Sequence, residues 1–277
     1  MIRLFSLLFV ALTVSGCAIA GKQTREVLDL PVETLPRSSQ IPDVPFINQT
    51  KNYCGPATLT MAMQFAGQNV TVDQLAPEVL TSSAKGSLQS DLISASRRRG
   101  MIAIPIEGMQ PLVKEIAAGN PVIVLENRGF GWLPRWHYSI VYGYDLNTQE
   151  LIMHSGHDAN TRQYLNRFER GSKLAGYWGL VVLAPSKLSA TGSVLDHLRA
   201  AAGLEQAERT AEADTAYKKI LERWPDNLGG LIGVGNAAFK MKDYARARSH
   251  LKKAVKLYPD SQQAKHNLSV VEAAISQ

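Results

Sequence analysis

Concentrated charge is largely missing from this chain of 277 residues, which has a formal net charge of only +6. The densest basic run is RRR at 97–99, and no aromatic residues are interleaved with basic residues around it. Because nucleic-acid-binding surfaces usually cluster such residues, we expect no nucleic-acid partner. A solvated helix end explains the three arginines better. The apolar fraction of 45% is ordinary for a globular protein with a sizeable core.

Metal ligands at a suitable spacing are also missing. His154 and His157 lie close together in the chain. No third ligand follows at a spacing typical of a zinc site or of another metal site. We interpret both histidines as polar surface or turn residues, and we predict neither a metal nor another cofactor.

Cysteine is scarce, since Cys17 and Cys54 are the only two in the chain. Cys17 ends the stretch MIRLFSLLFVALTVSGC, in which Arg3 precedes an apolar run and small residues precede the cysteine. This layout is typical of a secretory signal peptide, and the apolar run is too short for a comfortable membrane span.

The ending VSGC is similar to the lipobox of bacterial lipoproteins. That resemblance implies that Cys17 receives diacylglycerol and becomes the mature N-terminus. Ala18 follows the cysteine, which by the sorting rule of enteric bacteria favours the outer membrane. An ordinary signal peptide with a chance cysteine is the alternative. Residues 18–43 are polar and contain proline, so we predict a tether there.

Lipidation of Cys17 would leave Cys54 without a disulfide partner in an oxidising compartment. An unpaired thiol risks oxidation there, which favours a chemical role for Cys54. A buried, inert cysteine is the alternative interpretation.

Residues 44–185 show both helical and strand patterns, with the helices first. Helices are predicted over 54–66, 71–80, 87–99 and 109–120, and Ser87 is the expected N-cap of the third. Strands are predicted over 101–106, 121–127, 137–145, 150–155 and 177–184. The loop from Leu146 to Gln149 joins two of these strands as a hairpin. Helices followed by an antiparallel sheet predict an α+β domain.

Strand patterns stop after about residue 190, and residues 190–277 are helical in character. WPD at 224–226 and YPD at 258–260 recur 34 residues apart, which is the period of a tetratricopeptide helix pair. Residues 262–275 fit a capping helix. A four-helix appendage of another kind is the alternative. Two repeats and a cap form only a short solenoid, so we expect it to pack on the first domain or on a partner.

The start of the helix at Cys54 has the features of a nucleophile site. Unsatisfied N–H groups and the helix dipole favour a thiolate at such a position, and Pro56 is tolerated in a first helical turn. A thiol nucleophile also needs a base and a donor for the oxyanion. His137, at the start of a strand, is the candidate base, and Gln49 is the candidate donor.

The segment NQTKNYCGPATLTM, followed by WHYSIVYGYD, resembles the bacteriocin-processing, double-glycine-leader peptidase family. These proteins are papain-like cysteine peptidases. The resemblance covers residues 44–185 and implies that Cys54 is the nucleophile, His137 the general base and later acid, and Gln49 the oxyanion donor. The whole chain further resembles a subgroup of predicted lipoproteins in which tetratricopeptide repeats follow such a domain.

One position departs from the family pattern, in which an Asp ends the strand after the histidine. Here the matching residue is Ser155, within MHSG. A serine can accept a bond from the imidazole N–H, but it cannot stabilise an imidazolium as a carboxylate does. Asp158 would substitute if the chain turned back. Trp132 and Trp136 either line a substrate groove or cover the sheet.

The function expected from these observations is a lipid-anchored thiol peptidase on the periplasmic side of the cell envelope. Its substrates would be peptides or unfolded protein segments, and the repeats would hold a substrate or a partner. The related bacteriocin processors are fused to a transporter, whereas for this chain we expect an export signal and no transporter segment. Acyl transfer by the same groups stays open. The alternative is a catalytically weak or inactive scaffold in an envelope complex.

Overall fold

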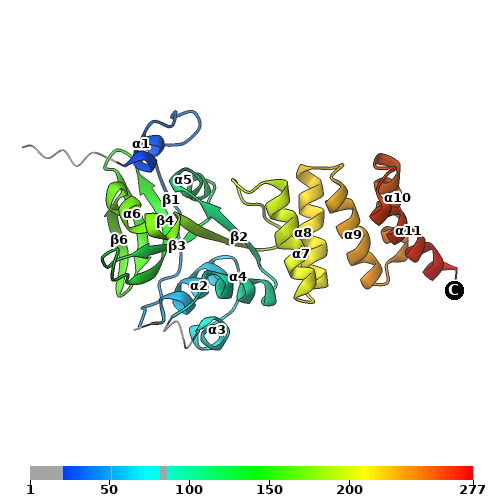
Figure 1. Ribbon diagram of the computed structural model, residues 1–277, viewed down its shortest axis with the longest axis horizontal. Coiled ribbons are helices and arrows are strands. Elements are labelled where there is room, and N and C mark those ends of the chain that lie inside the picture. Colours follow the sequence, from blue (N-terminus) through cyan, green and yellow to red (C-terminus); the bar gives the residue numbers. More distant parts are fainter. Residues whose placement is uncertain (1–20, 51, 82–85, 277) are drawn as a thin grey trace, which may run out of the picture.

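The computed structural model describes residues 21–50, 52–81 and 86–276 (Figure 1). Cys17 and the predicted signal sequence lie outside the described residues. Within the described part, no helix is both long enough and apolar enough to cross a bilayer.

A mixed α+β domain comes first in the chain, as predicted. Its strands are β1 (Ser38–Gln40), β2 (Ile102–Glu107), β3 (Val122–Asn127), β4 (Trp136–Asp145), β5 (Glu150–Ser155), β6 (Asp158–Tyr164) and β7 (Trp178–Leu183). Its helices are α1 (Lys22–Leu28), α2 (Cys54–Phe65), α3 (Val72–Val79), α4 (Gln89–Arg98), α5 (Met109–Ala117) and α6 (Leu165–Ser172), followed by the 3-10 turn η2 (Lys173–Ala175).

The seven strands form one antiparallel sheet, in which six follow the order β2-β7-β3-β4-β5-β6 and β1 pairs with β4 outside this order. β3 pairs with Trp136–Val141 of β4, whereas the short β1 pairs with Gly143–Asp145. The two strands therefore share one edge of β4 at its opposite ends. The hairpin predicted at Leu146–Gln149 joins β4 to β5.

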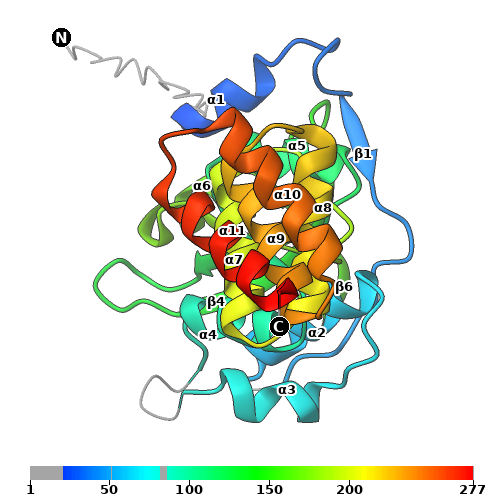
Figure 2. The ribbon, with the colours of Figure 1, turned by 90° about the vertical axis from the view of Figure 1, so that its right-hand side faces the viewer.

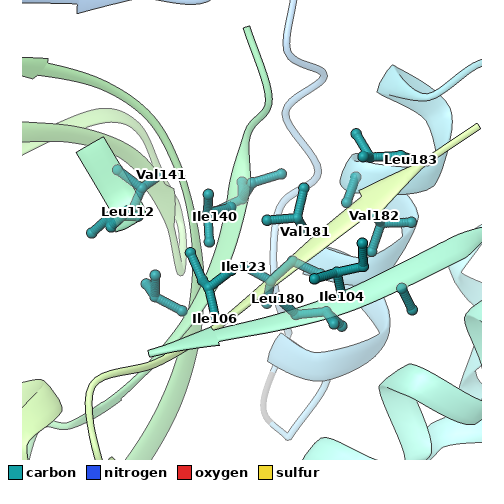
Figure 3. Packing of buried hydrophobic residues seen from close by; sticks show 14 of the residues in the cluster. Ile104, Ile106, Leu112, Ile123, Ile140, Val141, Leu180, Val181, Val182 and Leu183 are labelled. Atoms are coloured by element: carbon teal, nitrogen blue, oxygen red, sulfur yellow. The ribbon is translucent and has the colours of Figure 1, made fainter. Parts of the chain in front are cut away.

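Helices cover both faces of the sheet. In Figure 1, α2, α3 and α4 lie below it and α1 and α5 lie above it, and both α2 and α5 pack against β3 and β4. Every residue from Tyr138 to Tyr144 is buried, as expected for a strand that is covered on both sides. Figure 3 shows the resulting apolar layer, in which Ile123, Ile140 and Leu180 lie close together.

One predicted helix start was wrong. Ser87 does not cap α4, because the helix begins at Gln89 with Leu88 as its N-cap residue. The Asp91 carboxylate accepts the Leu88 backbone N–H at 3.1 Å and the Thr81 hydroxyl at 2.7 Å. A carboxylate in the first turn thus satisfies the helix start in place of the serine.

The tether predicted for residues 18–43 was also wrong for its described part. α1 packs against α5 and α6, with Thr24 and Val27 buried. The buried Glu169 of α6 accepts the backbone N–H groups of Gln23 and Thr24, both at 3.0 Å, and the Thr24 hydroxyl at 2.6 Å. One carboxylate therefore binds the first turn of α1, where an anion is favoured.

Residues 156–176 contain β6, α6 and η2, for which the sequence patterns predict nothing. β6 is polar on both faces and mostly exposed, so it has no apolar alternation. α6 buries Leu165 and Phe168 on one side only. Pairing with β5 and packing on β3 therefore decide these elements.

The C-terminal part consists of five helices, as the repeat pattern predicts: α7 (Val194–Gln206), α8 (Thr210–Arg223), α9 (Leu228–Lys240), α10 (Tyr244–Leu257) and α11 (Gln262–Ile275). The WPD and YPD segments follow α8 and α10 directly. α7 packs on β2 and α4, where Gly203 allows a close approach, since a Cβ there would lie 2.5 Å from the Arg97 side chain. Figure 1 shows α10 and α11 at the end farthest from the sheet domain, and in Figure 2 this end faces the viewer.

Candidate active site

Cys54 is the first residue of α2 and is half-buried. It has no disulfide partner in the part of the chain that the structure describes. No side chain among the described residues caps this helix start, so the first-turn N–H groups remain available to an anion. The Thr58 hydroxyl donates to the Cys54 carbonyl at 2.7 Å, which holds the first turn in place.

A cleft of about 960 Å³ opens at this helix start. Cys54 lines it together with His137 from β4 and Gln49 from the segment before α2. The structure therefore brings together the three residues that carry the family resemblance, although Cys54 and His137 are 83 positions apart in the chain. Trp136, Arg135 and Pro134 also line the cleft.

His137 contacts Ser155 on the neighbouring strand. Its Nε2 lies 3.1 Å from the Ser155 Oγ, so the predicted third residue is in hydrogen-bond contact with the imidazole. Asp158 is exposed and lies opposite Ser155 in the β5–β6 register; no hydrogen bond joins it to His137 within the described chain. Ser155, and not Asp158, is therefore the residue that contacts the imidazole.

Two further residues, both missed by the sequence interpretation, also contact the Ser155 hydroxyl. An Arg128 guanidinium nitrogen donates to it at 2.5 Å, and the Ser139 Oγ lies 2.8 Å away. Ser139 is two residues after His137 on β4, so strand alternation places it on the same face. Strand alternation alone would therefore have predicted that Ser139 lies on the same face as His137. Arg128 follows β3 without any motif, and only the folded sheet brings it to Ser155.

These contacts restrict the proton positions on Ser155. Arg128 donates to one lone pair of the hydroxyl, which leaves one donor and one acceptor position for His137 and Ser139. When the Ser155 O–H donates to Ser139, Nε2–H of His137 donates to Ser155. Nδ1 is then the unprotonated ring nitrogen and is free to act as the base.

His137 is held in its neutral form. Burial, reinforced by the positive charge of Arg128, lowers the pKa of His137 to about 4. The imidazole is therefore unprotonated at neutral pH and able to accept a proton. A carboxylate at the third position would stabilise the imidazolium, whereas Ser155 and the nearby Arg128 do not.

Gln49 is a buried amide without a hydrogen-bond partner. The residue is only 4% exposed. Neither Nε2 nor Oε1 of its side chain forms a hydrogen bond within the described residues. The backbone is firmly placed, since the Gln49 N–H donates to the Gly156 carbonyl at 3.0 Å. Buried amides are normally paired, so an unpaired amide that lines the cleft suits a donor reserved for a ligand oxygen.

The two tryptophans differ in position. Trp136 lines the cleft, whereas Trp132 is 81% exposed and stacks on Phe130 in the loop between β3 and β4. Of the two, only Trp136 therefore lies where a groove at Cys54 would be lined, and it is also the first residue of β4.

The two other histidines of this domain also differ. His154 is buried, and its Nε2 lies 3.1 Å from the Val44 carbonyl; the expectation of a surface or turn position was wrong for it. It faces away from Ser155, because neighbouring strand residues alternate. His157 is exposed beside Asn48. The described chain holds no group of three potential metal ligands.

Comparison with known proteins gives two family matches. Residues 41–181 match the Peptidase_C39 like family, and residues 229–261 match a tetratricopeptide repeat. The second match spans α9 and α10 and the YPD segment.

Three solved structures resemble the first domain. A putative C39-like peptidase from Bacillus anthracis is 18% identical, with a TM-score of 0.45, over 55% of this chain and 98% of its own. The peptidase domain of Streptococcus ComA, a bi-functional ABC transporter involved in a quorum-sensing pathway, is 21% identical, with a TM-score of 0.41, over 52% of this chain and 97% of its own. A double glycine motif protease from an AMS/PCAT transporter, in complex with the leader peptide, is 18% identical, with a TM-score of 0.41, over 52% of this chain and 96% of its own.

Proposed function

The chain belongs to the Peptidase_C39 like family, and we propose that it is a cysteine peptidase with Cys54 as its nucleophile. The observation that carries this proposal is the cleft itself. It is lined by a free thiol at a helix start, a neutral imidazole and an unpaired buried amide. Nucleophile, base and oxyanion donor are the three groups that acyl transfer requires.

The first half of the reaction forms a thioester. Nδ1 of His137 accepts the Cys54 thiol proton while the sulfur attacks the carbonyl carbon of the scissile peptide bond. The Gln49 side-chain N–H and the N–H groups at the start of α2 stabilise the tetrahedral oxyanion. His137 then returns the proton to the leaving amine, the C–N bond breaks, and the acyl group remains on the sulfur.

The second half releases the acyl group. His137 accepts a proton from water, whose oxygen attacks the thioester carbonyl, and the same donors bind the second oxyanion. Collapse of this intermediate expels the thiolate, which regains its proton from His137. The products are a carboxylic acid and the amine released earlier.

Ser155 and Arg128 determine how this family mechanism is modified here. The imidazolium that forms in each step has a hydroxyl beside it in place of a carboxylate, and a guanidinium close by. Both features make the imidazolium less stable. The proposed mechanism therefore uses His137 as a neutral general base, with a higher barrier than a carboxylate-assisted site would have.

The location of the peptidase and its partners extend the proposal. The signal-like residues 1–17 support export and a lipid on Cys17, which would anchor the enzyme in the cell envelope, on the periplasmic side of the outer membrane. Tetratricopeptide repeats commonly present concave binding surfaces. The repeat region would hold a protein partner or the substrate.

Thiol labelling of purified residues 18–277 tests the nucleophile, because this fragment contains Cys54 as its only cysteine. We expect a peptidyl thiol probe to label the wild type and to leave Cys54→Ala unlabelled. His137→Ala keeps the thiol but should label far more slowly, which separates a reactive cysteine from a merely accessible one. Folded wild type that resists labelling under reducing conditions would contradict the proposal.

Hydrolysis is tested by incubating the same fragment with envelope extracts and identifying new peptide termini by mass spectrometry. The Cys54→Ala protein is the control. New termini that appear only with the wild type support a peptidase. Acylated amines in place of free carboxyl termini would indicate acyl transfer.

A further inference from the structure

A second cavity of about 720 Å³ adjoins the thiol cleft, and Leu174 lines both. We call it the basic cavity. Its charged residues are Glu126, Arg128, Arg162, Arg167 and Arg170. Four guanidinium groups therefore surround one carboxylate. They come from β6, from α6 and from the end of β3, which are separate parts of the chain.

The single carboxylate is already engaged. Glu126 is 2% exposed, and its Oε1 accepts the Gln163 amide at 2.6 Å. Its Oε2 lies 3.9 Å from an Arg128 nitrogen. Burial also raises the pKa of Glu126, which weakens it further as a counter-charge.

The arginines differ in how they are paired. Arg162 forms an ion pair with Glu150 at 3.1 Å, and Arg128 bonds to Ser155. Arg167 and Arg170, three residues apart on α6, have no carboxylate within ion-pair distance in the described chain. Both are exposed at the cavity. Positive charge is therefore in excess in this cavity, since four guanidinium groups surround one carboxylate.

This excess matters because of where the cavity lies. Arg128 contacts the hydroxyl that holds His137, and Leu174 forms the common wall with the cleft. A peptide that is bound at Cys54 and extends past Leu174 would enter the cavity that Arg167 and Arg170 line. Guanidinium groups favour carboxylates through charge-assisted hydrogen bonds.

We propose that the basic cavity binds Asp or Glu side chains of the substrate, so that the peptidase prefers peptides with acidic residues near the scissile bond. The inference rests on the proposed peptidase function, and it specifies the substrate class. The cavity wall supplies the selectivity, since cationic side chains would be repelled and neutral ones would gain no ion pair.

Binding to the Cys54→Ala protein tests the inference without turnover. The probes are a fluorescein-labelled, C-terminally amidated Glu/Ala peptide and its Gln/Ala counterpart, followed by fluorescence anisotropy at low and high salt. We expect the Glu/Ala peptide to bind roughly tenfold more tightly at low salt, and the difference to shrink at high salt.

The decisive variant adds Arg167→Gln and Arg170→Gln, which should remove most of that preference. The matched control instead adds Lys240→Gln and Lys242→Gln to the Cys54→Ala protein. These substitutions remove two exposed lysines at the end of α9 and lower the net charge by the same amount. The control should keep the preference. Thermal unfolding confirms that both proteins fold.

Equal binding of the two peptides, or an equal loss in the lysine control, would overturn the inference. Binding of a free-acid Gln/Ala peptide alone would also overturn it, because the cavity would then recognise a chain end. The two proposals fail separately. Wild-type cleavage without acid preference contradicts the basic cavity only, whereas acid preference with an unreactive Cys54 contradicts the peptidase function only.

Discussion

The Nε2 atom of His137 lies 3.1 Å from the Oγ atom of Ser155. This hydroxyl also receives a hydrogen bond from Arg128 and lies beside Ser139. The imidazole is therefore oriented by a neutral group that is itself bonded to a cation. A carboxylate can both orient the ring and stabilise its charge, whereas Ser155 orients the ring without stabilising the charge.

Ser155→Ala removes the orientation and should lower kcat/KM by roughly five- to tenfold, the loss expected for one neutral hydrogen bond. Ser155→Asp should raise kcat/KM above that of the wild type, because a carboxylate beside His137 stabilises the imidazolium. Steady-state kinetics on a peptide cleaved by the wild type measure both. An Asp variant no faster than the Ala variant would contradict this role for residue 155.

The pH dependence should follow His137. Its pKa of about 4 keeps it neutral across the ordinary range, so kcat/KM should fall only as the pH decreases through about 4. Arg128→Gln removes the repelling charge and should move this acid limb upward, whereas Arg135→Gln, in the same cleft, should not. An acid limb near 6.5 in the wild type would contradict the assignment.

The same shift affects stability. The folded state holds His137 unprotonated, whereas the unfolded chain protonates it below about 6.5. The unfolded state then binds more protons, so stability should decrease as the pH falls from about 6.5 towards about 4. Urea unfolding of the wild type and His137→Gln at several pH values measures this, and the wild type should show the steeper decrease.

Gln49→Leu separates a catalytic role from a structural one. Loss of an oxyanion donor should lower kcat by about 10²–10³. The free energy of unfolding should be unchanged or should rise by about 1 kcal/mol, because the substitution removes a buried amide that lacks a partner. Denaturant unfolding and kinetics on one protein sample test both. A large loss of stability would indicate that the amide is structural.

Glu169→Ala should detach α1 from the domain. It removes the acceptor of three hydrogen bonds from Gln23 and Thr24, and we expect a loss of about 2–3 kcal/mol. Limited proteolysis should then cut between α1 and β1. The control is Glu26→Ala, which removes only a partly exposed pair with Lys22 and should be neutral within about 0.5 kcal/mol. Equal sensitivity of the two variants would contradict the docking of α1.

Much of the fold could be predicted from local patterns. Helical spacing and apolar strands indicate α2–α5 and most of the sheet, because these segments bury continuous apolar faces. The 34-residue spacing of the WPD and YPD segments likewise indicates the repeats. The patterns fail for α1, β6 and α6, whose positions depend on Glu169 and on pairing with β5.

The sequence by itself determined the chemistry that is available: a cysteine at a helix start, with a glutamine before it, a histidine opening a later strand, and a serine where a carboxylate is expected. These are local features, set by residue type and spacing. Tertiary structure alone decided that Arg128 bonds to Ser155, that the Gln49 amide is buried without a partner, and that arginines from β6 and α6 surround one cavity. Each depends on contacts between segments that only the folded sheet brings together.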